Sequence, residues 1–242
     1  MEPNLSANLT GDEPLQIKTK FKDISVAVCE DRVAGVQRIL AEKPEIDLIL
    51  LDDALQHRAI KPSTQLLLST YARPFYTDYL MPSGRLRERR SGALRTDAII
   101  FTKCPTDYEK RGWRYKPIFY SKIVYEKLPI SGPIYGFSAL ANNSVFEQHL
   151  AENYDLKGFT SFADHHLFTQ SDVDTLLKNA EGASLVCTEK DWVKTKDMYG
   201  TESIKHISIS NKLEGGQDFL DWLKSHIHLE WAFNNIGSKS IK

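Results

Sequence analysis

The sequence predicts an α/β protein with a parallel sheet, followed along the chain by a second, smaller α/β domain. Residues 46–51 form a short run of large aliphatic side chains with one acidic interruption, which is typical of a strand buried on both faces of a parallel sheet. A strand-like run and an amphipathic helix pattern precede it, giving a β-α-β order with an expected right-handed crossover. After residue 134 strand and helix patterns alternate again, and this second series predicts the smaller domain.

Length and composition exclude several classes of protein. The 242 residues, 41% hydrophobic and 26% charged, suffice for one large or two small domains with a sizeable core. A net charge of -1 without a long basic run argues against nucleic acid as a partner. Cys29, Cys104 and Cys187 are widely spaced and predict reduced thiols in a cytoplasmic protein. No apolar stretch approaches the ~20 residues of a transmembrane helix, and no secretory signal opens the chain.

The elements of the larger domain are expected in the first half of the chain. Thr10-Gly11-Asp12-Glu13 has the form of a capping box, so Asp12 should lie near a helix N-terminus, where its ionised form is stabilised. A further helix is predicted over residues 31–43, with Val33, Val36, Ile39 and Leu40 on one side. Strands are predicted at residues 24–29, 46–51, 65–69 and 97–102.

The second half of the chain begins with an alternating aromatic segment, residues 116–125. This pattern predicts a half-exposed antiparallel strand or a connecting ribbon. Strands are then expected at residues 134–138, near Phe159 and at 184–187, and helices at 145–152, 170–179 and 218–228. The expected organisation is a larger domain over residues 1–115, a linking ribbon over 116–133, a smaller domain over 134–230 and a tail over 231–242.

The predicted central strand ends in two adjacent carboxylates, Asp52 and Asp53, followed by Gln56 and His57. In open α/β sheets ligands bind beyond the carboxyl ends of the strands. An apolar strand that ends in Asp is also how a Walker B carboxylate is held against nucleotide-bound magnesium. The alternative is that the two residues only cap the next loop or helix. Two carboxylates followed so closely by Gln-His favour the functional interpretation.

A concentrated positive patch follows a Pro-Ser-Gly turn in the non-periodic region of residues 70–88. Its members are the arginines at positions 85, 87, 89 and 90. Guanidinium groups suit phosphate recognition because they offer forked donors. The alternative is a solvated basic face of a helix.

Asp164-His165-His166 precedes a helix that Thr169 or Ser171 could cap. A zinc site is not favoured, because adjacent imidazoles seldom reach one ion and no further ligand has suitable spacing. A histidine that serves as acid, base or orienter of a carboxylate fits better, since its pKa lies near working pH. A helix-capping Asp beside two surface histidines remains the alternative. Residues 188–191 also follow a strand, and their mixed charges suggest internal ion pairing that positions the loop.

Five of these segments occur in the order seen in the tetraacyldisaccharide 4'-kinase family, the lipid A 4'-kinases of Gram-negative envelope synthesis. They are Gly11-Asp12-Glu13-Pro14, Asp52-Asp53-Ala54-Leu55-Gln56-His57, Leu80-Met81-Pro82-Ser83-Gly84-Arg85-Leu86-Arg87-Glu88, Phe162-Ala163-Asp164-His165 and Thr188-Glu189-Lys190-Asp191. The resemblance runs from about residue 10 to 228. Ala54 and Leu55 replace a Gly and a Phe of the family pattern, and Ser83 and Arg85 also depart from it. These changes leave the polar groups in place.

The resemblance implies a P-loop-kinase-like three-layer α/β/α sheet and transfer of the ATP γ-phosphoryl group to a lipid. The acceptor would be the 4'-hydroxyl of a tetraacylated glucosamine disaccharide 1-phosphate, with Mg²⁺ as cofactor. The enzyme would then act peripherally at the cytoplasmic face of the bacterial inner membrane, with a membrane surface as partner. Phosphoryl transfer depends mostly on positioning and charge stabilisation.

The family motifs also imply roles for individual residues. Asp12 would be the base, and His165 would pair with it across two domains, so that domain closure assembles the site. Asp52 would hold magnesium directly or through water, with Asp53 beside it. The remaining expected site residues would line the site or meet phosphate on the lipid: Glu13, Gln56 and His57 in the first role, Arg85 and Arg87 in the second.

The Walker A segment of P-loop kinases, G-x-x-x-x-G-K-[ST], does not occur in this sequence, and only ten residues precede Gly11. The chain therefore resembles the family's protein without its first third, membrane-anchoring segment included, and by itself is expected to be inactive. Two alternatives stay open at this stage. One is a non-catalytic remnant that retains lipid binding, and the other is an unrelated α/β module whose acidic loop binds a divalent ion.

Overall fold

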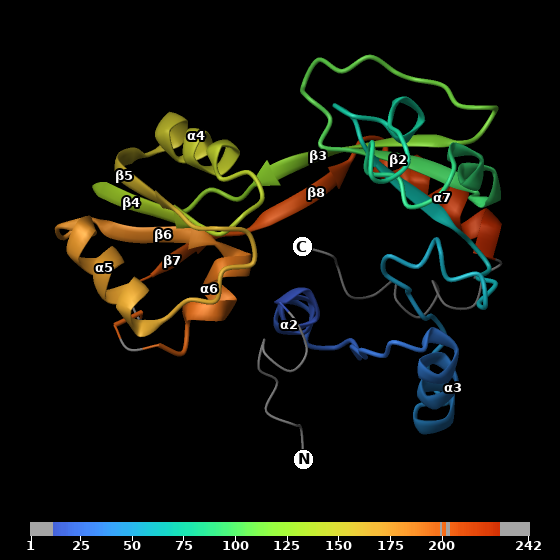
Figure 1. The fold of residues 1–242 in the computed structure, drawn as a ribbon, viewed down its shortest axis with the longest axis horizontal. Helices are drawn as coiled ribbons and strands as arrows, with labels where there is room; N and C mark the ends of the chain where they lie inside the picture. Colours follow the sequence, from blue (N-terminus) through green and yellow to red (C-terminus); the bar gives the residue numbers. More distant parts are fainter. Residues whose placement is uncertain (1–11, 199, 202–203, 228–242) are drawn as a thin grey trace. The chain divides into compact units, whose positions relative to one another are not determined.

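The computed structural model describes residues 12–198, 200–201 and 204–227. The chain divides into two compact units (Figure 1). Unit 1 comprises Met1–Val28 and Tyr125–Ser210, and unit 2 comprises Cys29–Val124 and Asn211–Lys242. This grouping differs from the predicted ranges, because the first helix clusters with the second half of the chain. The expected tail, residues 231–242, lies outside the described residues.

Unit 1 is built on a four-stranded parallel sheet with the order β5-β4-β6-β7. Its strands are β4 (Pro133–Ser138), β5 (Asp155–Ser161), β6 (Ser184–Thr188) and β7 (Lys205–Ile207). Its helices are α2 (Asp12–Lys20), α4 (Ser144–Asn153), α5 (Gln170–Ala180) and α6 (Glu189–Thr195). The strands and helices predicted between residues 134 and 187 are therefore confirmed, whereas α6 and β7 were not foreseen. The helix predicted over residues 218–228 is present as α7 (Gly216–Ile227), but it groups with unit 2.

Both faces of the unit 1 sheet are covered, which explains why its strands read as apolar runs. Phe137 and Leu185 point into a core that includes side chains of α5. Ile134 and Val186, three positions and one position away on the same strands, point into a second core formed with α4. Figure 1 shows α4 on one side of the sheet and α5 and α6 on the other. The alternation of side chains along each strand thus fixes where the helices pack.

The helix at the start of the described chain, α2, packs against α6. Lys20 forms an ion pair of 3.0 Å with Glu189, and the Gln16 amide donates to the same carboxylate at 3.4 Å. These contacts join segments about 170 residues apart in sequence. Asp12 and His165 therefore belong to the same unit, which corrects the expectation that they would lie in different domains.

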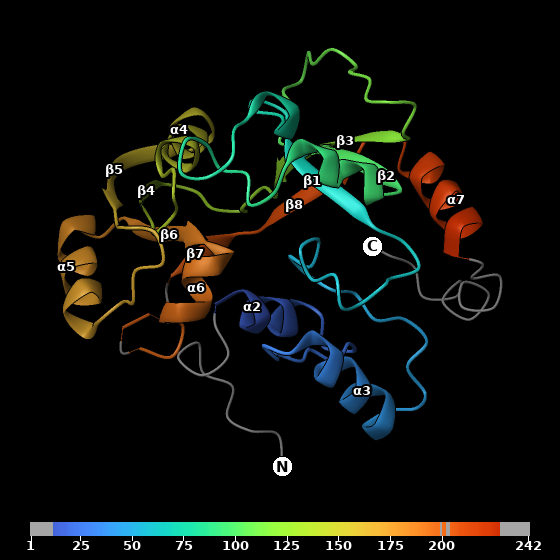
Figure 2. The ribbon, with the colours of Figure 1, turned by 45° about the vertical axis from the view of Figure 1, so that its right-hand side comes forward.

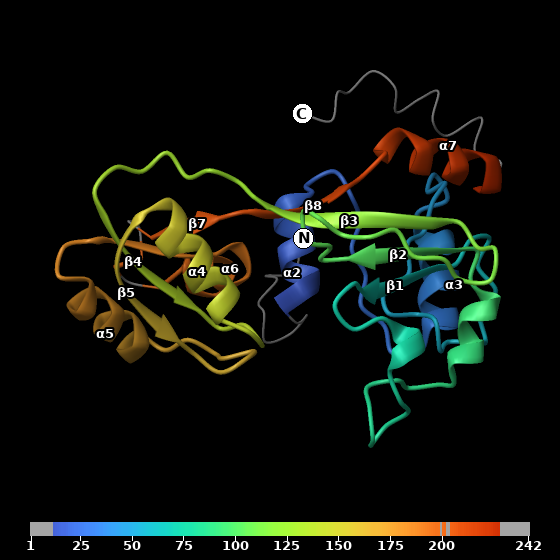
Figure 3. The same cartoon turned by 90° about the horizontal axis from the view of Figure 1, so that it is seen from above.

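Unit 2 contains a second four-stranded sheet with the order β1-β2-β3-β8. Its strands are β1 (Leu66–Thr70), β2 (Ala98–Thr102), β3 (Ile118–Tyr125) and β8 (Ile209–Leu213), the last residue of β3 and the first two of β8 being grouped with unit 1. Its helices are α3 (Arg32–Glu42), α7 (Gly216–Ile227) and the 3₁₀ helices η1 (Phe75–Thr77) and η2 (Arg90–Arg95). β1, β2 and β3 are mutually parallel and run side by side (Figures 2 and 3). On its other side β3 pairs with β8, and these two strands run in opposite directions (Figure 1), which agrees with the predicted antiparallel strand.

The core of unit 2 is aromatic on one face of this sheet. Phe101 and Tyr120 pack there against Phe75 of η1. On β3 the neighbouring side chain, Phe119, instead meets Phe219 of α7 at 5.0 Å between ring centroids. The 3₁₀ segments and α7 are therefore held by opposite faces of the same strands. This arrangement fixes the ends of the long loop that joins η1 to η2.

Two predicted strands, residues 24–29 and 46–51, are not strands in the structure. A strand must exchange its backbone hydrogen bonds with a neighbour, and neither segment is paired within the described residues. Leu50, expected in a buried central strand, is 85% exposed. The aliphatic run predicted a strand, but strand propensity alone does not supply a partner strand.

The helix predicted over residues 31–43 is confirmed as α3. Asp31 caps α3, since its carboxylate accepts from the backbone N–H of Val33 and Ala34. The three cysteines are free thiols, and two of them, Cys104 and Cys187, are buried. No helix in the described part of the chain combines the length and hydropathy that a bilayer-spanning helix requires.

Candidate active site

Asp52 and Asp53 lie in a turn-rich segment that follows residues 46–51. The backbone N–H of Asp53 donates to Oδ1 of Asp52 at 2.9 Å, and Asp53 has a φ of 45°. A side chain in this left-handed region is uncommon, although Asp tolerates it better than most residues. No helix begins within the next residues, so Asp52 supports a local turn rather than a helix cap. Both carboxylates are exposed.

The acidic loop is joined to the arginine loop within unit 2. Nη1 of Arg87 lies 2.5 Å from Oδ2 of Asp53, and both side chains are about three-fifths exposed. The sequence predicted these two residues as site residues independently, from motifs 34 positions apart. The structure brings them together.

A second set of hydrogen bonds also links the acidic loop to the arginine loop. Glu88 accepts two hydrogen bonds from Arg95, at 2.8 and 3.0 Å, and one from Arg58 at 3.4 Å. Arg95 also donates to the carbonyl oxygen of Leu55, at 3.0 Å. The hydrogen bonds from Arg95 hold the pKa of Glu88 below its usual range, so the carboxylate stays ionised. Sequence reasoning assigned no role to Glu88 or Arg95, and only their place near the motifs could have suggested one.

The other predicted residues of unit 2 are on the surface. Gln56 and His57 are exposed in the turns after Asp53. Arg85 is exposed as well, and its backbone N–H lies 3.4 Å from Oδ1 of Asp78. The expected helix after the arginines is the short η2, so their loop is not one face of a long helix. The alternative of a solvated basic helix face is therefore not supported.

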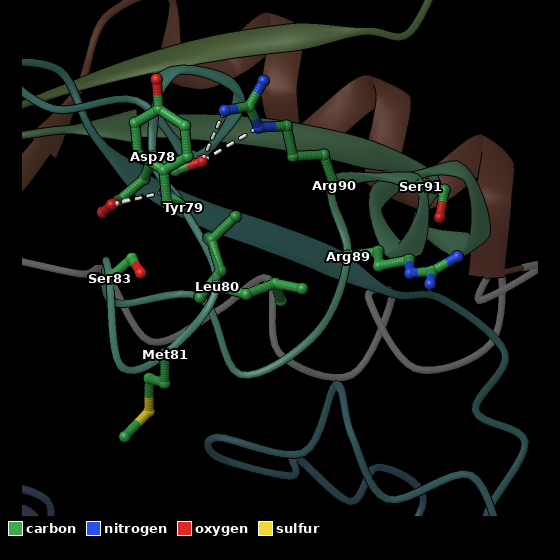
Figure 4. Close-up of a pocket in the computed structure, with 9 residues that line it drawn as sticks. Asp78, Tyr79, Leu80, Met81, Ser83, Arg89, Arg90 and Ser91 are labelled. Atoms are coloured by element: carbon green, nitrogen blue, oxygen red, sulfur yellow. Dashed lines mark hydrogen bonds between the residues drawn. The ribbon is translucent and has the colours of Figure 1, made fainter.

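The loop between η1 and η2 lines an open pocket of about 590 Å³ (Figure 4). Apolar side chains and arginines share its wall: Tyr79, Leu80, Met81, Leu86, Arg89 and Arg90 are among its lining residues. The guanidinium of Arg90 donates twice to the carbonyl oxygen of Asp78, at 2.9 and 2.7 Å. The pocket wall therefore offers both apolar side chains and cationic groups, a combination that suits an amphiphilic ligand.

In unit 1 the parallel strands β4, β5 and β6 bring their carboxyl ends to one edge of the sheet. Asn143 links two of the loops there, accepting from Oγ of Ser138 at 2.6 Å and donating to the carbonyl oxygen of Phe162 at 2.9 Å. The backbone N–H of Phe162 in turn donates to the carbonyl oxygen of Ser138. These bonds hold the loop that carries Asp164 and His165 against the end of β4.

Asp191 links the third loop to the same edge and is fully buried. Its Oδ2 accepts from Oγ1 of Thr188 at 2.7 Å and from the backbone N–H of Ala139 at 3.1 Å. Burial raises the pKa of Asp191, and these hydrogen bonds offset only part of that effect. Thr188 also caps α6, so the Thr-x-x-Asp spacing was the sequence signal for this helix.

His165 lies at the turn that opens after β5, with a φ of 58°. The carboxylate of Asp164 accepts from the backbone N–H of His165 at 3.0 Å, and it lies 3.8 Å from both Nε2 of His165 and Nζ of Lys190. Asp164 therefore organises the turn and does not cap a helix. The predicted ion pairing of residues 188–191 is confirmed by the contacts of Lys190 and Glu189.

The adjacent imidazole, His166, is in a different environment. Its Nε2 lies 3.1 Å from Oδ2 of Asp172, which belongs to the capping box of α5. Its ring stacks on Phe162 at 4.8 Å and meets Phe168 edge-on at 5.2 Å. His166 is thus packed into the structure, whereas the side chain of His165 is about 60% exposed.

The remaining predicted site residues are at the start of α2. The described part of α2 starts at Asp12, and Glu13 is exposed in its first turn. Thr10 and Gly11 lie outside the described residues. Among the residues that are described, no group of three or more His, Cys, Asp or Glu is arranged to hold a metal ion.

Asp52 and Asp53 nevertheless offer a donor set that suits magnesium. Mg²⁺ is usually held by one or two carboxylates together with substrate phosphates, rather than by a cage made only of protein. Two neighbouring, exposed carboxylates meet that requirement. They would be completed by the oxygens of a phosphorylated ligand.

The fold and these loops define an α/β protein with parallel sheets and with acidic, basic and imidazole groups gathered beyond the ends of strands and in the loops of each unit. The sequence profile of the family described as tetraacyldisaccharide-1-P 4'-kinase matches residues 1–228. The chain belongs to this family.

Individual relatives agree with the family profile. A tetraacyldisaccharide 4'-kinase from Cytophaga hutchinsonii is 39% identical over 206 residues, which cover 76% of this chain and 59% of the relative. One from Flavobacterium johnsoniae is 30% identical and aligns with 91% of this chain and 71% of its own length. The chain thus spans about three-fifths of the first relative.

A solved structure has the same fold. The crystal structure of LpxK from Aquifex aeolicus in complex with ATP superposes with a TM-score of 0.75 at 26% identity. It covers 93% of this chain, and this chain covers 71% of it. The predicted P-loop-kinase-like α/β fold is therefore confirmed.

Proposed function

We propose that this chain contributes to an ATP-dependent kinase that phosphorylates the 4'-hydroxyl of a tetraacylated glucosamine disaccharide 1-phosphate. The observation that carries this proposal is the ion pair between Asp53 and Arg87, which unites the acidic loop with the arginine loop. Phosphoryl transfer requires charge stabilisation around phosphate oxygens, which carboxylate-bound magnesium and guanidinium groups supply. Family membership supports this choice of reaction and of lipid acceptor.

In this proposal Asp52 and Asp53 hold Mg²⁺, and ATP supplies the remaining oxygen ligands. The metal neutralises charge that develops on the transferred phosphoryl group. Asp53 carries two functions, because its carboxylate also pairs with Arg87. Asp52 is then the more available metal ligand, since its Oδ1 accepts only from the neighbouring backbone N–H among the contacts described.

Asp12 and His165 would handle the proton of the acceptor hydroxyl. Asp12 would accept it, and His165 would pair with Asp12 and adjust its basicity. Two features support this assignment. Asp12 begins a helix that packs against α6, and Lys190 of α6 contacts the carboxylate next to His165. Both groups therefore depend on α6 for their placement.

The remaining predicted residues would bind the two substrates. Exposed side chains can contact a ligand because other protein atoms do not cover them. Glu13, Gln56 and His57 would line the site, and Arg85 and Arg87 would meet phosphate on the lipid. A guanidinium suits that role because it is always charged and forked. A lipid acceptor also implies a membrane surface as partner, at the cytoplasmic face of the bacterial inner membrane.

The test compares two proteins, the 242-residue chain and a version extended through any upstream reading frame. Each is incubated with ATP, Mg²⁺ and the disaccharide lipid, and phosphorylated lipid is measured. Activity in either form that requires Asp52 supports the proposal. Lipid binding without phosphorylation in both forms would favour a lipid-binding remnant instead. Absence of both lipid and ATP binding would contradict any role in this reaction.

A further inference from the structure

Three consecutive apolar side chains stand on the surface of unit 2 in the loop between η1 and η2. Tyr79, Leu80 and Met81 are 64%, 42% and 65% exposed. Figure 4 shows Met81 extending away from the other labelled side chains of the pocket. Single exposed apolar residues are ordinary, but a contiguous group with a polar rim marks an interaction surface.

The loop is held in shape, so this exposure does not come from a lack of local contacts. The carboxylate of Asp78 is buried and accepts from the guanidinium of Arg73 at 2.7 Å and from the backbone N–H of Tyr79 at 2.8 Å. The backbone N–H of Leu86 donates to the carbonyl oxygen of Tyr79, and that of Met81 donates to the carbonyl oxygen of Leu86, both at 3.0 Å. The loop thus closes on itself.

Close approach of the backbone confirms how tightly the loop folds. A Cβ atom added at Gly84 would lie 2.2 Å from the carbonyl oxygen of Tyr79 and 2.5 Å from Oδ1 of Asp78. Only glycine fits there without displacing the loop. The tip therefore presents exposed apolar side chains on a backbone that several internal hydrogen bonds hold closed.

Positive charge surrounds this tip. Between residues 73 and 95 the chain carries six arginines and two acidic residues, a net charge of +4. Both acids are already paired, Asp78 with Arg73 and Glu88 with Arg95. The arginines at positions 85, 87, 89 and 90 are all exposed. The surface of this loop therefore consists of apolar side chains at its tip and positively charged arginines beside them.

We propose that residues 79–91, the amphipathic loop, are the surface through which unit 2 contacts a bilayer that contains anionic phospholipid. Apolar side chains would enter the interfacial region while the arginines stay at the level of the lipid phosphates. Three apolar residues are too few for the core of a stable protein interface, which buries roughly 800 Å² on each partner. This inference rests on the proposed function in one respect, which is that the lipid acceptor of the proposed reaction lies in a bilayer.

The first experiment measures co-sedimentation of the 242-residue chain with vesicles, in the absence of ATP and of the disaccharide lipid. One set contains phosphatidylcholine alone, and the other an equal mixture of phosphatidylcholine and phosphatidylglycerol. Failure of the kinase assignment would leave the result of this experiment unaffected. We expect binding to the mixed vesicles and little binding to the neutral ones, because each arginine near an anionic surface strengthens binding about fivefold.

Variants separate the apolar from the cationic contribution. The double variant Leu80→Ser/Met81→Ser should bind mixed vesicles on the order of tenfold more weakly. Val145→Ser, which removes a 49% exposed apolar side chain from α4 in unit 1, is the matched control and should bind normally. Arg89→Gln should weaken binding about fivefold, whereas Arg38→Gln on α3 should not.

Insertion is detected directly with Met81→Trp. Its added fluorescence should shift to the blue and be quenched by brominated phospholipid on mixed vesicles, while that of Val145→Trp should not. Unchanged emission of the tryptophan at position 81, or normal binding of the double variant, would overturn the proposal. Equal binding to neutral vesicles would also overturn it, as would loss of binding on addition of inorganic phosphate with no effect of the double substitution. Circular dichroism confirms that each variant is folded.

Discussion

The guanidinium of Arg87 and the carboxylate of Asp53 form an ion pair of 2.5 Å, although 34 residues separate them along the chain. The pair is exposed to solvent, and such pairs contribute little to stability because water and salt screen them. The contribution of this ion pair is to fix the positions of the two side chains. It holds a phosphate-binding type of side chain beside a magnesium-binding type of side chain, which is the combination that phosphoryl transfer uses.

Arg87→Ala should therefore affect function far more than stability. We expect the free energy of unfolding to fall by less than about 1 kcal/mol, while phosphorylation of the lipid falls at least about tenfold. Denaturant titration and an activity assay on the active form of the protein measure the two effects. Arg38→Ala, which removes an exposed pair with Glu42 on α3, is the control and should leave activity unchanged. A large loss of stability without loss of turnover in Arg87→Ala would contradict the positional role.

Asp52→Ala should lower turnover by about two orders of magnitude or more, the usual scale for lost charge stabilisation at a transition state. The fold should survive, because Asp52 is exposed and its side chain supports only a local turn. Turnover is measured over a range of Mg²⁺ concentrations. Near-normal turnover at limiting Mg²⁺ would show that Asp52 is not the metal ligand, and Asp53 would become the candidate.

Asp12 and His165 should behave as one proton-accepting group. Asp12→Ala and His165→Ala should each lower kcat with little change in ATP affinity, and the double variant should be scarcely worse, since residues that act together are strongly non-additive. Steady-state kinetics and ATP titration provide these values. Independent, additive losses would rule out the dyad.

His166→Ala is the internal control for that experiment. Its ring is hydrogen-bonded to the carboxylate of Asp172 and stacked on Phe162. We therefore expect the free energy of unfolding to fall by about 1–2 kcal/mol. Its effect on kcat should be mild. If His166→Ala abolished turnover while His165→Ala did not, the catalytic role would belong to the other imidazole.

His149 should make unit 1 sensitive to acid. Burial lowers its pKa in the folded protein, and its ring stacks on Tyr125 at 3.9 Å. In the unfolded chain the pKa returns to about 6.5, so the unfolded state binds more protons in the interval between the two values. Its contribution to stability is complete above about pH 6.5 and is lost as the pH falls through the lowered value.

His149→Phe retains the ring stacking but cannot be protonated. The melting temperature of this variant should therefore fall less steeply than that of the wild type when the pH is lowered below about 6.5. Thermal melts over a pH series provide the comparison. Identical pH profiles for the two proteins would show that His149 does not contribute to acid sensitivity.

Asp191→Ala should be strongly destabilising. The substitution leaves the backbone N–H of Ala139 and the hydroxyl of Thr188 without their buried acceptor, at a cost of about 2–4 kcal/mol. Asp174→Ala on the exposed side of α5 is the matched control and should change stability little. Urea denaturation measures both. Equal stability of the two variants would mean that the three strand-end loops do not depend on Asp191.

Part of the candidate site could be predicted because its signals are short. The helices predicted over residues 31–43 and 170–179 are confirmed, and the structure gives them the N-caps Asp31 and Thr169, the latter being one of two candidate caps in the sequence. Asp53 and Arg87 were recognised from their motifs without any knowledge that they touch. The sequence did not reveal that Glu88 and Arg95 hold the acidic loop in place. Nothing in their local sequence distinguishes charged residues that hydrogen-bond to a distant loop from ordinary charged residues on the surface.

The sequence by itself determined the α/β class, the parallel strands of unit 1 and the motifs that carry the family resemblance. These depend on periodicity and on side-chain chemistry within a few neighbouring residues, which a linear sequence displays directly. Only the tertiary structure decided that the first helix groups with the second half of the chain, that β3 runs parallel to β2 and that residues 46–51 remain unpaired among the described residues. Each of these depends on contacts between distant segments, whose free energy is set by the packing of the whole fold and leaves no local pattern.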